Sequence, residues 1–248
     1  MPFTFSHPAI VLPLSRLPIN RISSTGLVIG SMAPDFEYFI NMRMQREHGH
    51  SWGGLFYYDL PVTIISAFLF HLLVRDKLIN SLPELLRIRF SKYTGNNWLA
   101  WVKKYWYVLI YSSLIGIFSH IFWDAFTHEH GYFVRRIPFL QQQSRIFMAD
   151  IPNYHLNQIF SSLFGGFFIS LVILLPLNKK LNFHILWPKL SYWTIVIIIQ
   201  VAIIFVRGIE SFGDFVATSI SGFFIGMMLA PTLIHFISKK IWKTENSQ

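Results

Sequence analysis

Three polar side chains follow one another at four-residue spacing near the end of an apolar stretch. His120, Asp124 and His128 stand in the run Ser-His-Ile-Phe-Trp-Asp-Ala-Phe-Thr-His. On an α-helix, residues four apart lie on one face about 6 Å apart along the axis, so the spacing predicts a polar stripe. Imidazole and carboxylate groups are ligands of zinc and similar divalent ions. A cation would also offset the cost of an ionised Asp in a membrane-like segment, so the stripe indicates a metal site.

The other ligand-type residues fall in three clusters nearer the N-terminus. His7 stands in Phe-Ser-His-Pro, Asp35 and Glu37 follow a proline, and His50 stands in His-Gly-His-Ser. A helix cap is the alternative for Asp35, because Asp commonly caps the helix that follows a turn. A solvated or hydrogen-bonded side chain is the alternative for His7. Because the chain has no cysteine, a metal site must use His, Asp, Glu or water.

The composition is that of a membrane protein. The 248 residues are 53% hydrophobic and 13% charged, against about 25% charged residues in a typical soluble domain. The net charge of +9 comes from basic residues in short clusters beside apolar segments. This is the distribution that the positive-inside rule predicts, so we expect the bilayer and not a nucleic acid to be the partner.

The apolar segments predict an all-α integral membrane protein with about five transmembrane helices. A span needs roughly 17–25 residues. The stretch 27–40 is too short and too polar to cross, and is expected to be a re-entrant or interfacial helix. The five predicted spans are Leu55–Val74, Tyr105–Thr127, Gln158–Leu177, Leu190–Val206 and Phe215–Ile237.

Lys and Arg residues favour one orientation and the ligand-type residues favour a division of the chain. The connections after the first and third spans and the C-terminal tail carry most of the basic residues, which places the C-terminus in the cytoplasm and the His/Asp motifs toward the outer face of the membrane. We expect residues 1–178 to form a metal-site membrane domain and residues 179–248 a two-span scaffold, packed together as one unit. Gly222 and Gly226 predict close helix packing in that scaffold.

Residues 1–14 lack a basic region and a cleavage site, so we expect them to stay on the mature protein.

The same motifs carry a family resemblance. Four runs look like an uncharacterised bacterial multi-span membrane family of unknown function, and the resemblance covers about residues 1–175. That family is similar, more distantly, to membrane-bound metal-dependent hydrolases and to zinc-dependent phospholipase C. The runs are Met-Pro-Phe-Thr-Phe-Ser-His-Pro-Ala at the start, Val-Ile-Gly-Ser-Met-Ala-Pro-Asp-Phe-Glu-Tyr-Phe at 28–39, Gly-His-Ser at 49–51 and the stripe at 119–128.

The resemblance implies a ligand set and an activity. The implied metal ligands are His7, Asp35, His50, His120 and Asp124. A further helical His-x-x-x-Glu of the phospholipase pattern is not found in this sequence, so the resemblance implies one or two zinc-like ions. The expected activity is metal-dependent hydrolysis of an amphipathic ester or phosphoester at the membrane interface, with Glu37 or His128 as general base.

Two other classes of function stay open. The polar cluster of a non-enzymatic membrane protein could bind metal without catalysis or tie helices together by hydrogen bonds alone. An ion- or proton-coupled transporter could use the stripe as a relay, although relay residues are expected near mid-membrane and these gather toward one face. Ligand atoms within about 5 Å of one another would favour a metal site.

Overall fold

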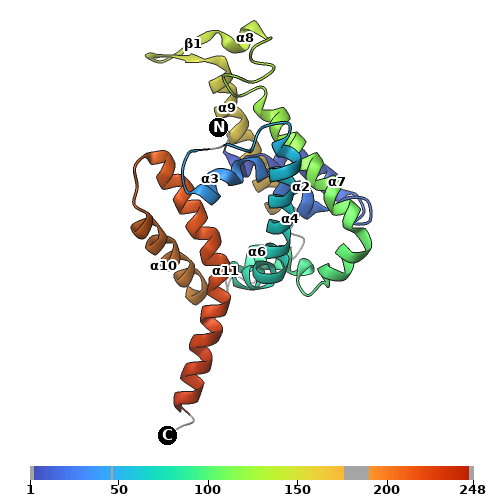
Figure 1. Cartoon of the computed structure of the whole chain (residues 1–248), viewed down its shortest axis with the longest axis vertical. Helices are drawn as coiled ribbons and strands as arrows, with labels where there is room; N and C mark the ends of the chain where they lie inside the picture. Colours follow the sequence, from blue (N-terminus) through green and yellow to red (C-terminus); the bar gives the residue numbers. More distant parts are fainter. Residues whose placement is uncertain (1–2, 46, 176–189, 246–248) are drawn as a thin grey trace. The chain divides into compact units, whose positions relative to one another are not determined.

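A computed structural model describes residues 3–45, 47–175 and 190–245 (Figure 1). The chain divides into two compact units, each built from three segments. The predicted domain boundary at residue 178 lies outside the described residues, so that division stays a prediction. Unit 1 comprises Met1–Phe36, Glu47–Ala67 and Leu99–Pro176, and unit 2 comprises Glu37–Arg46, Phe68–Trp98 and Leu177–Gln248.

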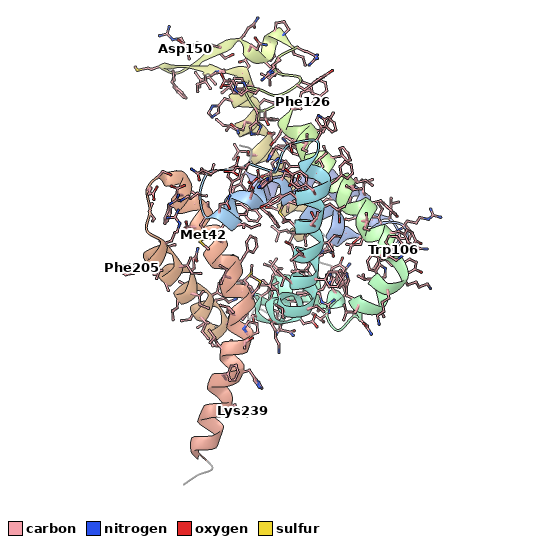
Figure 2. All side chains as sticks on the ribbon, in the orientation of Figure 1. Met42, Trp106, Phe126, Asp150, Phe205 and Lys239 are labelled. Atoms are coloured by element: carbon pink, nitrogen blue, oxygen red, sulfur yellow. The ribbon has the colours of Figure 1, made fainter. Side chains whose placement is uncertain are left out.

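Four helices are long and apolar enough to cross a membrane, which confirms the all-α membrane class. They are α7 (Trp98–Asp124), α9 (Asn153–Leu174), α10 (Leu190–Arg207) and the Phe212–Phe236 part of α11 (Phe212–Glu245). The backbone of α7 departs from helical geometry at Tyr105, where the span was predicted to begin. Figure 2 labels Trp106, which directly follows this break, and Phe126, two residues beyond the end of the helix.

The first predicted span, Leu55–Val74, is helical but is not one regular α-helix. It consists of a π-helical turn η4 (Leu55–Asp59), α4 (Leu60–Leu69) and a second π-helical turn η5 (Phe70–Val74). Each π turn holds an additional residue per turn and interrupts the α-helical hydrogen-bond ladder. When a candidate span must be a single long helix, the described residues contain four, whereas five were predicted.

Short helices make up the N-terminal region of unit 1. They are η1 (Thr4–Ser6), α1 (Pro8–Val11), η2 (Leu12–Arg16), α2 (Ser24–Gly30) and η3 (Ala33–Asp35), and the chain continues into α3 (Phe36–Asn41). The predicted re-entrant or interfacial piece therefore consists of three short helices. Ser23 caps α2 by accepting a hydrogen bond from the Gly26 amide at 3.1 Å.

Glycines bring two of these short helices against the long ones. A side-chain carbon at Gly116 of α7 would lie 2.7 Å from the Ser31 amide nitrogen at the end of α2. A side-chain carbon at Gly165 of α9 would lie 2.9 Å from both Cβ and O of Ser6 in η1. The Ser6 hydroxyl also donates to the Ser162 carbonyl at 2.8 Å. These close approaches fix α2 on α7 and η1 on α9.

A small apolar cluster joins the elements that carry most of the candidate ligands. Ala33 of η3, Leu55 of η4 and Ile117 of α7 are fully buried against one another. Their burial removes apolar surface from contact with polar groups and water and so stabilises this junction. Asp35 lies in η3, two residues after Ala33, and His120 lies in α7, three residues after Ile117.

The sequence between α7 and α9 forms α8 (Pro138–Gln141) and the one sheet among the described residues, which lead into α9 (Figure 1). Strands β1 (Gln143–Ile146) and β2 (Ala149–Pro152) are antiparallel, with Arg145 opposite Asp150. The tip residues Phe147 and Met148 are each 98% exposed.

In unit 2, α10 and α11 pack closely against each other. A side-chain carbon at Gly226 would lie 2.8 Å from the Val196 carbonyl oxygen, and one at Gly222 would lie 3.0 Å from Cα of Gln200. The prediction of close packing at these two glycines is confirmed. Unit 2 also contains α5 (Arg75–Ser81), α6 (Glu84–Phe90) and η6 (Ser91–Tyr93).

Candidate metal centre

Five side chains that lie far apart in the sequence converge at the C-terminal end of α7. Asp35 ends η3, and two of the five, His120 and Asp124, lie on the last two turns of α7. His7 directly follows η1, and His50 lies in the loop before η4. Two overlapping groups, His7/Asp35/His120 and His50/His120/Asp124, each bring their ligand atoms within 4.8 Å of one another. Buried His and Asp groups in this arrangement could hold a metal ion.

Four ligand atoms surround one point. Nε2 of His120 lies 3.2 Å from Nε2 of His50, 3.3 Å from Oδ2 of Asp124 and 3.7 Å from Oδ1 of Asp35. Nε2 of His50 lies 3.2 Å from the same Asp124 oxygen and 3.6 Å from the same Asp35 oxygen. Zinc binds N and O ligands at about 2.0–2.1 Å, so the edges of its coordination tetrahedron are about 3.3–3.4 Å long. Three of the five distances are close to this spacing, and the two to Oδ1 of Asp35 exceed it by a few tenths of an ångström, so a zinc ion would need only a small shift of Asp35.

Main-chain carbonyls orient two of the imidazoles. Nδ1 of His120 lies 2.8 Å from the Ser31 carbonyl oxygen, and Nδ1 of His7 lies 3.2 Å from the Thr4 carbonyl oxygen. A carbonyl only accepts, so each Nδ1 donates its proton, and in a neutral ring Nε2 carries the lone pair. A ligating histidine in metalloproteins is oriented in the same way. Both Nε2 atoms face carboxylate oxygens: His7 Nε2 lies 3.3 Å from Oδ1 of Asp124.

One carboxylate oxygen of Asp35 accepts a hydrogen bond and the other does not. Its Oδ2 accepts a hydrogen bond from the Thr4 hydroxyl at 2.6 Å. Its Oδ1 is buried and has no hydrogen-bond partner among the described residues. That oxygen is the one that faces His50 and His120, and buried polar atoms normally have a partner. The carboxylate is therefore not a helix cap, and its free oxygen fits a cation.

His50 occupies a strained backbone conformation. Its φ of +65° lies in the left-handed region, which residues with a side chain adopt only at a cost in energy. Ser51 supports the turn, because its hydroxyl donates to the His48 carbonyl at 3.0 Å and accepts from the Gly54 amide at 2.9 Å. Burial lowers the pKa of His50, which favours the neutral ring that a metal requires.

The two buried carboxylates of the cluster need positive charge beside them, from protonated imidazoles or from a cation. Asp35 is fully buried and Asp124 is 7% exposed. Among the described residues, the ion-pair partners of both carboxylates are imidazoles. Two buried carboxylates beside neutral rings would leave two uncompensated negative charges, which is costly. A divalent cation would neutralise both, so the donor set fits such an ion.

His128 differs from the prediction of a three-residue stripe on one helix. The α-helix ends at Asp124, and His128 lies in the turn that follows, where its amide donates to the Asp124 carbonyl at 3.1 Å. The chain turns back here because the Phe133 amide donates to the Ala125 carbonyl. Nδ1 of His128 still lies 3.5 Å from Oδ1 of Asp124, and burial lowers the pKa of this imidazole.

Glu37 is buried in the first turn of α3, two residues beyond Asp35, and belongs to unit 2. It is in neither of the two ligand groups found in the described part of the chain. Its role as a general base stays a prediction.

The sequence did not reveal the groups that orient the ligands. Thr4 stands three residues before His7 and binds Asp35 through its side chain and His7 through its carbonyl. The three-residue spacing of Thr4 and His7 carries no signal for that double contact in a single sequence. Ser31 acts through its main chain, so its residue type carries no signal either.

Comparison with known proteins identifies a family but no activity. A search of the curated proteins and a search of the solved structures each found no match. A family model described as a domain of unknown function, DUF4184, matches residues 1–232. The prediction of an uncharacterised family is confirmed, and the more distant similarity to metal-dependent hydrolases and phospholipase C stays a prediction. The chain belongs to the DUF4184 family.

Proposed function

We propose that this protein is a membrane-bound, zinc-dependent hydrolase of an amphipathic ester or phosphoester. The ligands would be His7, Asp35, His50, His120 and Asp124, holding one or two ions. The cluster would lie toward the outer face of the bacterial cytoplasmic membrane, with the C-terminus in the cytoplasm. The observation that carries the proposal is the meeting of four ligand atoms at 3.2–3.7 Å, one of them a buried carboxylate oxygen without a hydrogen-bond partner among the described residues.

The two oxygens of Asp124 support the number of ions proposed. Oδ2 faces His50 and His120, while Oδ1 faces Nε2 of His7. The His7 ring stacks on the His120 ring with 3.9 Å between ring centroids. One ion would use the four atoms around Asp35 Oδ1, and the His7 side of Asp124 offers ligands for a second.

The chemistry of hydrolysis requires a Lewis acid and a base. A bound zinc ion would polarise the ester or phosphoester oxygen and lower the pKa of water toward about 7. His128 would be the base: its Nδ1 lies 3.2 Å from the Asp124 carbonyl oxygen, which favours a proton on Nδ1 and a lone pair on Nε2. Nε2 is buried with no hydrogen-bond partner among the described residues. It would take the proton from the attacking water and return it to the leaving alkoxide.

Metal content tests the proposal most directly. We expect protein purified in detergent to contain at least one equivalent of zinc by elemental analysis, and His120→Ala and Asp124→Asn to lose it. His155→Ala, which changes a histidine outside both ligand groups, is the matched control and should keep its metal. Metal-free wild-type protein that is fully folded would refute the proposal.

Activity separates hydrolysis from the alternatives. We expect the metal-loaded protein to release product from a short-chain fluorogenic ester or phosphodiester in micelles, and His128→Gln to lower the rate while keeping the metal. Stoichiometric metal without turnover of either class of substrate would favour a non-catalytic metal-binding protein. Metal-dependent ion flux into proteoliposomes would favour a transporter.

A further inference from the structure

An apolar groove lies beside the candidate metal centre in unit 1. Its volume is about 490 Å³, within the range of about 300–1,000 Å³ typical of small-ligand sites. Its walls come from α1 and η2, from the end of α7 and from α9. We propose that this groove binds one acyl chain of a bilayer phospholipid.

The surface of the groove is chemically suited to a hydrocarbon chain. Phe122, Phe126, Phe164 and Phe168 supply aromatic rings from two helices. The polar residues of the lining direct their donors elsewhere. Asn157 donates to the Phe126 carbonyl at 3.2 Å, and the hydroxyls of Thr127 and Ser161 donate to main-chain carbonyls of their own segments. A molecule bound in the groove would therefore contact mainly carbon atoms.

The long walls of the groove are helices that a bilayer would surround. Both α7 and α9 are candidate spans. Next to the groove, α9 exposes Phe160, Leu163 and Phe167 by 65–70% each, which is compatible with lipid and unfavourable in water. One turn of a helix with its side chains fills about 400–600 Å³. The groove would thus hold about one turn of a neighbouring span, too little for a stable helix contact, whereas it accommodates a single thin chain.

The direction of the groove matches the polarity of a phospholipid. Asn157 and Phe168 are eleven residues apart on α9, so the lining extends about 16 Å along the helix. Thr127, three residues after the candidate ligand Asp124, and Asn157 line one end of the groove, and Phe164 and Phe168 line the other. A chain bound with its methyl end beside Phe168 would place its carboxyl ester at the polar end.

Two contacts connect the groove to the candidate ligands. Trp123 lines the groove and lies against His7, with 5.5 Å between ring centroids. Ala9 and Ile10 line it from α1, directly after His7. Binding of the acyl chain would therefore place the lipid beside the His/Asp cluster. This last step, that the bound lipid is the substrate, rests on the proposed function.

A phosphatidylcholine with a diazirine in one acyl chain tests the groove. The full chain is reconstituted into nanodiscs containing this lipid, irradiated and mapped by peptide mass spectrometry. We expect adducts on Phe122, Phe126, Phe164 and Phe168 in clear excess over the outward-facing Phe160, Leu163 and Phe167. Equal labelling of both sets would overturn the inference, and so would cross-linking of the groove residues to a second copy of this chain.

A matched pair of variants on α9 gives a second test. Ser161→Trp would fill the groove, whereas Ser170→Trp adds the same ring to an exposed position outside its lining. We expect groove adducts to fall several-fold in Ser161→Trp alone, with zinc content unchanged in both. Unchanged adducts in Ser161→Trp would contradict the inference.

The two proposals fail separately. Loss of zinc in Asp124→Asn with groove adducts retained is the expected result. Absence of zinc from the wild type together with groove adducts would refute the hydrolase and leave the lipid site. Zinc present with evenly distributed adducts would refute the lipid site and leave the metal centre.

Discussion

Thr4 holds the candidate ligand Asp35 in place without contacting the centre of the cluster. Its hydroxyl satisfies Oδ2 at 2.6 Å and leaves Oδ1 directed at the two imidazoles. Partners of this kind fix the rotamer of a ligand, and their removal in metalloproteins typically costs about 10–100-fold in metal affinity or activity. The main-chain contact of Thr4 with His7 does not depend on its side chain.

Thr4→Val should therefore weaken zinc binding by about 10–100-fold while preserving the fold. Val keeps the shape of the side chain and removes only the hydroxyl donor. Competition with a chromophoric chelator measures the affinity. Thr94→Val is the control, because that hydroxyl donates to a carbonyl in an exposed turn, and it should bind zinc as the wild type does. Equal affinities of the two variants would contradict the role of Thr4.

The left-handed backbone at His50 predicts an unusual order of stabilities in metal-free protein. Alanine at a left-handed position costs roughly 1–2 kcal/mol, whereas glycine adopts this conformation freely but loses more entropy on folding, by roughly 0.5–1 kcal/mol. We expect His50→Gly to unfold at a higher temperature than His50→Ala in detergent with chelator present. Both should lose metal. A lower unfolding temperature for His50→Gly would show that the turn is not strained.

Residue types and motifs predicted which side chains converge but not how they are oriented. The run from Ser119 to His128 and the early His and Pro-Asp motifs contain the side chains that converge. The tautomers of His7 and His120 depend on carbonyls of residues 4 and 31, and a carbonyl is present at every position of a chain. Only the folded backbone distinguishes these two from the rest.

The sequence predicted the bounds of a helix accurately where hydropathy alone determines them. The span predicted at Leu190–Val206 is found at Leu190–Arg207. The end of α7 was placed three residues too late, because the turn after Asp124 is closed by hydrogen bonds from Phe133 and Val134 to Ala125. Those bonds are tertiary, so apolar periodicity does not contain them. The association of short N-terminal helices with α7 and α9 depends likewise on glycine contacts between distant segments.

Two adjacent glycines on α9 test that association. A side-chain carbon at Gly165 would lie 2.9 Å from Ser6 of η1, whereas one at Gly166 would lie 3.8 Å from the nearest atom, the Ser6 hydroxyl. We expect Gly165→Ala to destabilise the protein by about 1–3 kcal/mol, because the backbone of η1 must move. It should also weaken zinc binding, since His7 follows η1 directly.

Gly166→Ala is the matched control and should be neutral or stabilising by up to about 1 kcal/mol, because alanine favours a helix over glycine. Thermal unfolding in detergent and zinc content provide the two measurements. If both variants behaved alike, the close approach of η1 to α9 would not determine the position of His7.

The path of the whole chain bears on the number of membrane crossings. His50 lies beside His120 near the C-terminal end of α7, whereas Leu99 lies at the start of the same helix. At 1.5 Å per residue, Leu99 and His120 would be at most about 32 Å apart, and the break at Tyr105 shortens this distance, against a hydrocarbon core of about 30 Å. The chain between residues 50 and 99 must cover this distance. The helical segment 55–74, at most about 30 Å long, belongs to the longest helical run in this part of the chain.

We therefore expect the segment 55–74 to cross the membrane despite its π turns, giving five crossings in total. The chain has no cysteine, so each introduced thiol is the only one to react. With an impermeant maleimide on intact cells, Trp52→Cys and Met148→Cys should be labelled, since both side chains are exposed and precede or follow a crossing on the outer side. Lys92→Cys should react only after permeabilisation.

The pattern of labelling separates the crossing from the orientation. Labelling of Trp52→Cys and Lys92→Cys from the same side would show that residues 55–74 do not cross, and the N-terminal ligands could then reach Asp124 only if α7 itself lay along one face of the bilayer. Reversed labelling of all three thiols would keep five crossings and place the His/Asp cluster at the cytoplasmic face. In that arrangement the basic connections would face outward, against the distribution of charge that the positive-inside rule requires.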